Sequence, residues 1–372
     1  MKRLTPSEAI GPAFNRTREI LFQPFRFGRS WKLAASTYVA IMGTAYIPFC
    51  TLGLICFMFW RPNLYGPIRP GHAVLGILGA LVFDVLSFWI FTLASRMQLV
   101  SFDIAVERAQ FVAPVWRKYH PLRWRWAKLK LAITTPLAFV AWLPFVFFLR
   151  WAVRSATILN AGQQNPFQFI ASFLLGYVGF FVGVSLVIVA GGLLADFVLP
   201  SLALENITPE EALRRFQMHF RQEPGSICGY AALKVVLAIA GFIAHYAVSS
   251  IVMLFFYFLV IIPAIIGGLA LPHMAATGHV LGIAGLVVFA IFFLAIYGYV
   301  QLFTIGTVTL FLRCYAAYYL GGRYPLLGEL LEPPGQSWWN LQPAPQPPSP
   351  APENPEPPAI ADEPAIADEP AS

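Results

Sequence analysis

The fold is decided by the pattern of residues 206–221, which read Asn-Ile-Thr-Pro-Glu-Glu-Ala-Leu-Arg-Arg-Phe-Gln-Met-His-Phe-Arg. Thr208 is suited to cap a helix, Pro209 fits its first position, and Glu211 is placed to complete a capping box. The residues that follow put an apolar stripe on one helix face: Ala212, Leu213, Phe216 and Phe220. We therefore predict an amphipathic helix that leads into a long apolar run.

The chain opens in the same way. Residues 4–10 read Leu-Thr-Pro-Ser-Glu-Ala-Ile and echo residues 207–213, and a weaker copy begins near residue 101. We interpret these copies as three repeats of one unit, consisting of an interfacial helix, an outward span and an inward span, at approximately residues 5–100, 101–200 and 206–325. Two interpretations of the repeat stay open: a pseudo-symmetric bundle around an axial site, as in transporters, or a duplicated helical scaffold.

The composition predicts an integral membrane protein. The 372 residues are 58% apolar and only 12% charged, whereas soluble domains are about 25% charged. A helix needs about 20 apolar residues to cross the hydrocarbon. Six stretches meet this need: 34–60, 73–95, 131–149, 167–199, 231–262 and 280–312. The predicted fold is an all-α, polytopic bundle of six spans with a pseudo-threefold repeat, and residues 231–271 form either one span or two.

Three helices are too polar to span and are predicted to lie in the membrane interface: residues 7–21, 101–116 and 206–221. Basic and aromatic residues follow the first two, as in segments that contact anionic headgroups. The predicted lipid-anchor residues are Arg26, Arg29, Trp31, Lys32, Arg117, Lys118, Arg123, Trp124, Arg125 and Trp126. Because these residues lie next to predicted spans, we expect lipid headgroups as their partners and not nucleic acid.

The charge distribution predicts the orientation. Alternate segments outside the spans carry 20 of the 25 Lys and Arg residues. The positive-inside rule then places both termini and all three interfacial helices in the cytoplasm. Residues 1–332 form the predicted membrane domain. Residues 333–372 hold 13 prolines, six acidic residues and no Lys or Arg, which predicts a disordered tail that is a candidate site for a protein partner.

Polar residues inside predicted spans are the candidates for chemistry. Asp84 lies halfway along the second span, where an ionised carboxylate costs about 2.5 to 3.5 kcal/mol. His245, at comparable depth in the fifth span, is the predicted partner of Asp84, and Asp196 is expected to reach the cytoplasmic interface. Each of these three residues can have a purely structural role instead of a functional one. The sequence holds no nucleophile, phosphate-loop, metal-site or dinucleotide motif, so we predict no enzyme activity, no cofactor and no metal site.

Three stretches carry a resemblance to known sequences. Residues 7–29, Ser-Glu-Ala-Ile through Phe-Gln-Pro-Phe-Arg-Phe-Gly-Arg, resemble the opening of an uncharacterised bacterial family of multi-pass membrane proteins, a domain of unknown function. Residues 310–320, Leu-Phe-Leu-Arg-Cys-Tyr-Ala-Ala-Tyr-Tyr-Leu, resemble its last helix. The helix containing residues 211–213, Glu-Ala-Leu, is similar to one in membrane domains fused to glycerophosphodiester phosphodiesterases. The resemblance implies a six-helix fold in the bacterial inner membrane with no established activity.

Two functions are compatible with this pattern. The first is a non-enzymatic inner-membrane scaffold or regulatory protein whose cytoplasmic interfacial helices contact lipid. The alternative is a small-molecule or ion transporter with Asp84 in the bundle interior. A transporter needs a hydrated cavity that reaches Asp84, whereas a scaffold packs this residue shut.

Overall fold

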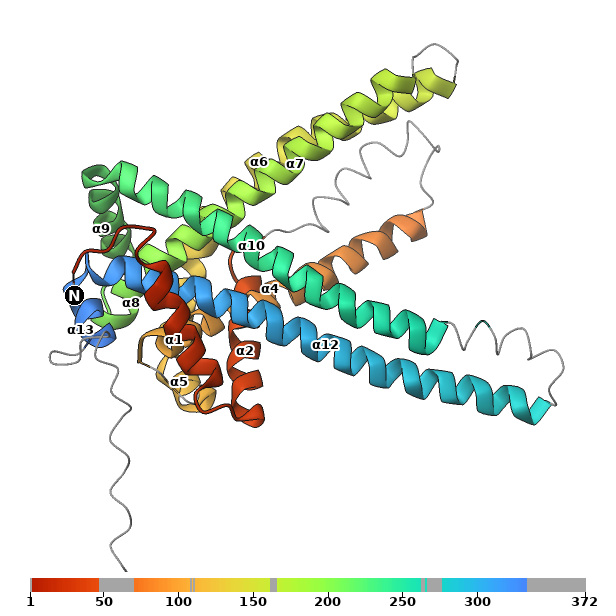
Figure 1. The fold of residues 1–372 in the computed structure, drawn as a ribbon. Helices are drawn as coiled ribbons and strands as arrows, with labels where there is room; N and C mark the ends of the chain where they lie inside the picture. The colour runs from red at the N-terminus through yellow and green to blue at the C-terminus, as the bar shows by residue number, and fades with distance from the viewer. Residues whose placement is uncertain are drawn as a thin grey trace, which may run out of the picture. The chain divides into compact units, whose positions relative to one another are not determined.

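The computed structural model describes residues 2–46, 70–107, 109, 111–160, 166–261, 265 and 276–332, and every regular element in them is helical. The chain divides into two units, residues 1–331 and 332–372. The predicted disordered tail, residues 333–372, lies outside the described residues. The helices of Figure 1 are α1 (Ile10–Phe22), α2 (Phe27–Met42), α4 (Pro70–Glu107), α5 (Val112–Lys118), α6 (Arg123–Asn160), α7 (Pro166–Phe197), α8 (Leu199–Glu205), α9 (Pro209–Gln222), α10 (Pro224–Phe256), α12 (Ala276–Gly321) and α13 (Pro325–Leu331).

Within the described residues, four helical segments are long and apolar enough to cross a membrane: Val74–Glu107, Tyr177–Glu205, Pro224–Leu259 and Val287–Gly321. Few of the residues in their most apolar stretches are buried by protein; Leu75, Leu186 and Val288 are 68%, 65% and 67% exposed. Large exposed apolar surfaces mark contact with another apolar phase. The helices are therefore compatible with a multi-pass membrane protein, while the six spans and the threefold repeat stay predictions.

The buried core lies at one part of each long helix. It combines the C-terminal parts of α4, α7 and α12 with the N-terminal parts of α6 and α10, and α1, α2, α5, α8, α9 and α13 pack around them. Beyond the core, α6 lies along α7, and α10 lies along α12 (Figure 1). The polar residues discussed below belong to this core.

Helix α2 packs through small residues against several longer helices. Its buried residues are Ser30, Leu33, Ala34, Ser36, Thr37 and Ala40, and small residues allow helix backbones to approach closely. A Cβ at Gly306 of α12 would overlap the carbonyl oxygen of Ala34, and the Thr37 hydroxyl donates to the Gly306 carbonyl over 2.7 Å.

The first predicted span, residues 34–60, is not one continuous helix. Helix α2 ends at Met42, and the break lies where Gly43 meets α4: a Cβ at Gly43 would sit 2.6 Å from the carbonyl carbon of Ala94. The absence of a side chain at Gly43 lets the two backbones approach this closely. Residues 47–60 lie outside the described residues.

The predicted interfacial helix at residues 101–116 is wrong. Helix α4 continues without a break to Glu107, and residues 101–106 are buried in the core. Only the short α5 follows, from Val112. The helical spacing of apolar residues in this region is the same for a core-facing helix as for an interfacial one.

The two N-terminal capping motifs both form, but differently. The Thr5 N–H and hydroxyl both donate to the Glu8 carboxylate, at 2.8 and 2.9 Å, and the Glu8 N–H donates to Thr5 Oγ1 over 3.4 Å. This is the reciprocal geometry of a capping box, formed on the turn that precedes α1 and not at its N-cap, Ala9. The two hydrogen bonds that the Glu8 carboxylate accepts from Thr5 lower the pKa of Glu8. At α9, the Glu211 N–H donates to Thr208 Oγ1 over 3.3 Å, but the Glu211 carboxylate pairs with Arg215 instead. The second box is therefore half formed.

Candidate functional site

A buried ion cluster holds three long helices together. Asp196 of α7 is 2% exposed. Its Oδ1 accepts from Arg313 Nη1 of α12 over 3.3 Å, and its Oδ2 accepts from the Tyr230 hydroxyl of α10 over 2.8 Å and from Lys234 Nζ. Arg313 Nη1 also donates to the Ala195 carbonyl over 3.2 Å. One carboxylate thus faces two cations, and the cluster carries a net charge of +1 when all three groups are ionised.

Aromatic stacking closes one side of this cluster. The Tyr230 ring stacks on Tyr319, with centroids 4.4 Å apart, and on Tyr315, at 5.2 Å. Phe197 of α7 meets Tyr230 edge-on at 5.5 Å. These rings cover the Tyr230 side of the cluster, where Tyr230 is fully buried, whereas Lys234 and Arg313 reach a cavity.

A cavity of about 170 Å³ lies beside Lys234 and Arg313. Its walls are formed by α2, α7, α10 and α12 and by Thr44. Most of its wall is apolar, and its charged members are Lys234 and Arg313. The lining residues are Ile41, Thr44, Ile188, Val189, Gly192, Leu193, Ala231, Lys234, Val235, Ala238, Phe242, Thr309, Leu312 and Arg313. Asp196 is not among them, so the cavity presents cations and apolar side chains.

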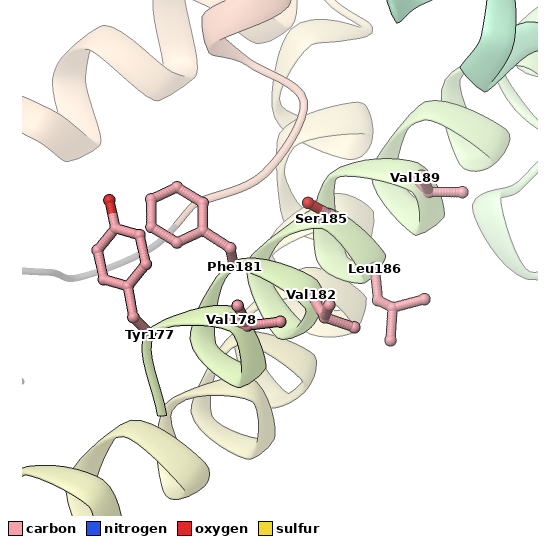
Figure 2. A pocket seen from close by; sticks show the side chains of 7 residues that line it. All are labelled: Tyr177, Val178, Phe181, Val182, Ser185, Leu186 and Val189. Carbon is pink, nitrogen blue, oxygen red and sulfur yellow. The ribbon is translucent and has the colours of Figure 1, made fainter. Parts of the chain in front are cut away.

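A groove of about 350 Å³, open to the surface, runs along α7 next to this cavity. Figure 2 shows its side chains projecting from successive turns of one helix: Tyr177, Val178, Phe181, Val182, Ser185, Leu186 and Val189. Val189 lines both the groove and the cavity. The two hollows are therefore neighbours on either side of Val189. The cations line the cavity, and the groove is lined by apolar side chains together with Ser185 and Tyr177.

Three further buried cations bind backbone carbonyls at helix C-termini. Arg16 of α1 donates from Nε to the Ala105 carbonyl over 3.2 Å and from Nη2 to the Val106 carbonyl over 2.6 Å, at the end of α4. Arg96 donates to the Trp116 carbonyl of α5, and Lys130 donates to the Gly43 carbonyl after α2. The last carbonyls of a helix lack partners and carry partial negative charge. These cations supply the missing donors and tie each helix end to another helix.

Lys130 also organises a polar contact inside the core. Its Nζ is within 2.9 Å of Gln98 Oε1, which accepts a second hydrogen bond from Trp126 Nε1 over 3.0 Å. The Gln98 amide nitrogen donates to the Ala40 carbonyl of α2 over 3.0 Å. Lys130 and Trp126 are fully buried, so this network joins α2, α4 and α6.

The structure separates the three polar residues predicted from the sequence. Asp196 lies in the buried ion cluster, and its place relative to a membrane interface stays a prediction. His245 Nδ1 is 2.6 Å from Thr304 Oγ1 of α12, and its Nε2 is 3.5 Å from Ser249 Oγ. Asp84 is half-buried on α4, and its main-chain carbonyl accepts from the Tyr46 hydroxyl over 3.4 Å. The hydrogen bonds of the His245 ring therefore go to α10 and α12 residues and not to Asp84.

The predicted lipid-anchor residues divide into two groups. Exposed members are Arg26, Lys32, Arg117, Lys118, Trp124 and Arg125, and half-buried ones are Arg29, Trp31 and Arg123. The prediction that Trp126 contacts lipid is wrong, because its side chain is fully buried. Lys118 pairs with Asp103 at 2.8 Å and Glu107 at 2.9 Å; burial opposes its charge, but these hydrogen bonds raise the pKa of Lys118. Asp103 also accepts from the Tyr119 hydroxyl over 2.6 Å, and burial and this bond raise the pKa of Tyr119.

Sequence reasoning missed the cations of the core, above all Lys234. This lysine lies in the apolar run that begins at Ala231, and an ionisable residue within a predicted span is by default a functional-site hypothesis. Lys234 could therefore have been found as the partner of Asp196, since both lie near the same predicted side of the membrane. Arg16, Arg96 and Lys130 carry no such signal, because their carbonyl partners are set by tertiary packing.

The comparisons with known proteins place the chain in a family. A model described as a family of unknown function (DUF7544) matches residues 4–330. The chain belongs to this family. The match covers the helical unit and confirms the prediction of an uncharacterised domain. No curated protein and no solved structure matches the chain, so nothing supports the resemblance of the helix at residues 211–213 to membrane domains of glycerophosphodiester phosphodiesterases.

Proposed function

We propose that this chain is a non-enzymatic membrane scaffold or regulatory protein that acts through contacts with lipid. The observation that carries the proposal is the division of the basic residues between the interior of the protein and its surface. The buried cations Arg16, Arg96, Lys130 and Arg313 bind helix ends or Asp196, and so hold helices together. Basic and aromatic side chains near the same core stay exposed: Arg26, Lys32, Arg117, Trp124 and Arg125. This division supports a rigid helical body with a lipid-contacting rim.

The proposed topology has six spans in the bacterial inner membrane, with both termini and the basic rim in the cytoplasm. Its support is the positive-inside bias of the sequence together with four apolar helices in the described residues. Cysteines introduced one at a time beside Arg123 and in the tail of a variant lacking the four native cysteines test it. Membrane-impermeant maleimide added to intact cells should leave both sites unlabelled. Labelling of either site from the periplasm refutes the topology.

The lipid-contacting rim is tested by replacing Arg26, Lys32 and Arg125 with glutamine. Each basic residue near an anionic surface contributes about 1 kcal/mol, so the triple variant should carry fewer anionic lipids in discs excised from membranes with styrene–maleic acid copolymer. The matched control replaces Glu210, Glu329 and Glu332 with glutamine. An unchanged ratio of anionic to zwitterionic lipid in the triple variant contradicts the proposed rim.

The alternative function, a transporter for a small molecule or ion, rests on Asp84. This carboxylate lies in the apolar part of α4 and is half-buried. Asp84→Asn keeps the shape of the side chain and removes its charge. Growth and protein abundance are measured in cells that carry either the variant or the wild type. Altered growth at normal abundance of the variant favours the transporter, and unchanged growth at normal abundance removes the transporter hypothesis.

A further inference from the structure

We propose that the cavity between α2, α7, α10 and α12 binds one anionic glycerophospholipid, with its phosphate against Lys234 and Arg313 and an acyl chain in the groove along α7. This inference goes beyond the proposed scaffold function and needs only that the chain is embedded in a membrane. It concerns a partly open cavity between helices, whereas the rim residues Arg26, Lys32 and Arg125 are exposed.

Charge complementarity identifies the polar part of the ligand. Lys234 and Arg313 line the cavity with side chains 19% and 12% exposed, whereas the Asp196 side chain that pairs with both is fully buried and does not line it. A ligand in the cavity therefore meets two cations and, among the lining residues, no carboxylate. The cluster has one positive charge in excess. An anion bound there balances the charge, and a phosphate can accept from both an ammonium and a guanidinium group.

The size of the cavity identifies the rest of the ligand. Sites for whole small molecules usually measure about 300–1,000 Å³, so 170 Å³ accommodates only part of a molecule. The neighbouring hollow is the groove on α7, which shares Val189 with the cavity and extends to Tyr177 (Figure 2). Twelve residues of helix correspond to about 18 Å. A charged end followed by an apolar path of this length has the polarity of a phospholipid and not that of a soluble phosphate ester.

The direction of the site agrees with insertion from the membrane. The groove runs from the cations toward the part of α7 whose apolar side chains are exposed; Leu174, Leu175 and Phe167 are 60%, 74% and 73% exposed. An acyl chain leaving the cavity along this path meets mainly apolar side chains. Lys234 lies about ten residues after Pro224, where α10 begins, and Arg313 lies about eight residues before Gly321, where α12 ends. The phosphate would therefore lie near the ends of α10 and α12 that belong to the buried core.

Filling the cavity tests the proposal without touching the ion cluster. Gly192 lines the cavity, and a Cβ added there meets nothing within 4 Å, so Gly192→Leu places its side chain in the cavity without a backbone clash. The matched control is Gly179→Leu on the same helix, where a Cβ also meets nothing within 4 Å and which lines neither hollow. Native mass spectrometry of the full-length protein in detergent counts bound dioleoylphosphatidylglycerol against dioleoylphosphatidylcholine.

One uncompensated positive charge contributes about 1 kcal/mol toward an anionic lipid, which corresponds to about a fivefold preference for phosphatidylglycerol. We expect this preference in the wild type and in Gly179→Leu and its loss in Gly192→Leu. Equal binding of the two lipids by the wild type, or an unchanged preference in Gly192→Leu, overturns the proposal.

A second pair of variants tests the charge. Lys234→Gln leaves Asp196 with Arg313 as a balanced pair and should bring the two lipids to parity, whereas Lys234→Arg should keep the preference. Equal behaviour of the two variants overturns the role of the cations. Excess inorganic phosphate should not displace the lipid; displacement assigns the site to a soluble phosphate compound. Neutralising Arg26, Lys32 and Arg125 should leave the phosphatidylglycerol preference of the cavity intact, so a failure of the rim and a failure of the cavity are distinguishable.

Discussion

Replacing Gly306 by alanine tests the close packing of α2 on α12. A Cβ at Gly306 would overlap the Ala34 carbonyl oxygen and lie 2.6 Å from the Ala34 carbonyl carbon. Carbon atoms in contact normally lie about 3.5–4.0 Å apart, so the two backbones must move apart by roughly 1 Å. This movement also lengthens the 2.7 Å hydrogen bond from the Thr37 hydroxyl to the Gly306 carbonyl.

The magnitude follows from three contributions. Overpacking a tight contact costs about 1–3 kcal/mol, and a lost hydrogen bond costs about 0.5–1.5 kcal/mol. Alanine is a better helix former than glycine by about 1 kcal/mol, which offsets part of the loss. We therefore expect Gly306→Ala to lower the free energy of unfolding by about 1–3 kcal/mol.

The assay is thermal unfolding of the full-length protein in one detergent, followed by intrinsic fluorescence. The matched control is Gly298→Ala, eight residues earlier on α12, where an added Cβ meets nothing within 4 Å. Gly298→Ala should gain helix propensity without a clash and melt at or above the wild-type temperature. The reasoning is refuted when Gly306→Ala melts at or above the wild type, or when the two variants fall equally.

Three more predictions follow from the core and α9. Asp196→Asn leaves Lys234 and Arg313 without their carboxylate, and breaking a buried ion pair costs about 3–5 kcal/mol; size-exclusion chromatography should show much less folded protein than for the exposed control Glu329→Gln, and equal yields contradict this. Burial lowers the pKa of His219, with the neighbouring Glu223 acting in the opposite direction. The folded state therefore binds a proton on His219 less readily than the unfolded chain, whose histidine titrates at about pH 6.5. The contribution of neutral His219 to stability is present above that pH and is lost as the pH falls. Melting of His219→Gln should depend less on pH below about 6.5 than melting of the wild type, and parallel pH profiles would argue against the assignment. Thr208→Ala removes the hydroxyl that accepts from the Glu211 N–H and should cost about 1 kcal/mol by the same thermal assay, whereas Thr208→Ser should stay near wild type.

The sequence predicted those helices that are determined by interactions between residues close together in the chain. The Thr208-Pro209 start of α9 and the long apolar runs of α7, α10 and α12 depend on propensity, capping and hydropathy, and these act within a few residues. The end of α2 at Gly43 does not. Gly43 lies against Ala94, about fifty residues away, and no pattern within residues 34–60 records that contact.

The candidate site divides in the same way. Asp196 could be selected from the sequence because a carboxylate in an apolar run is unusual. Its pairing with Arg313 could not be, because the two residues are 117 positions apart. The basic residues near the core look alike in the sequence, yet Arg16 and Lys130 are buried at helix ends while Arg26 and Arg125 are exposed. Whether a cation meets lipid or a carbonyl is decided by packing, not by composition.

The ion cluster also has a consequence for how the protein is made. The ribosome releases Asp196 well before Lys234, 38 residues later, and Arg313, 117 residues later. Until α12 has been synthesised, Asp196 lacks one of its two cationic partners, and chains cut short after α9 lack both. The cluster is therefore complete only when α12 joins α7 and α10.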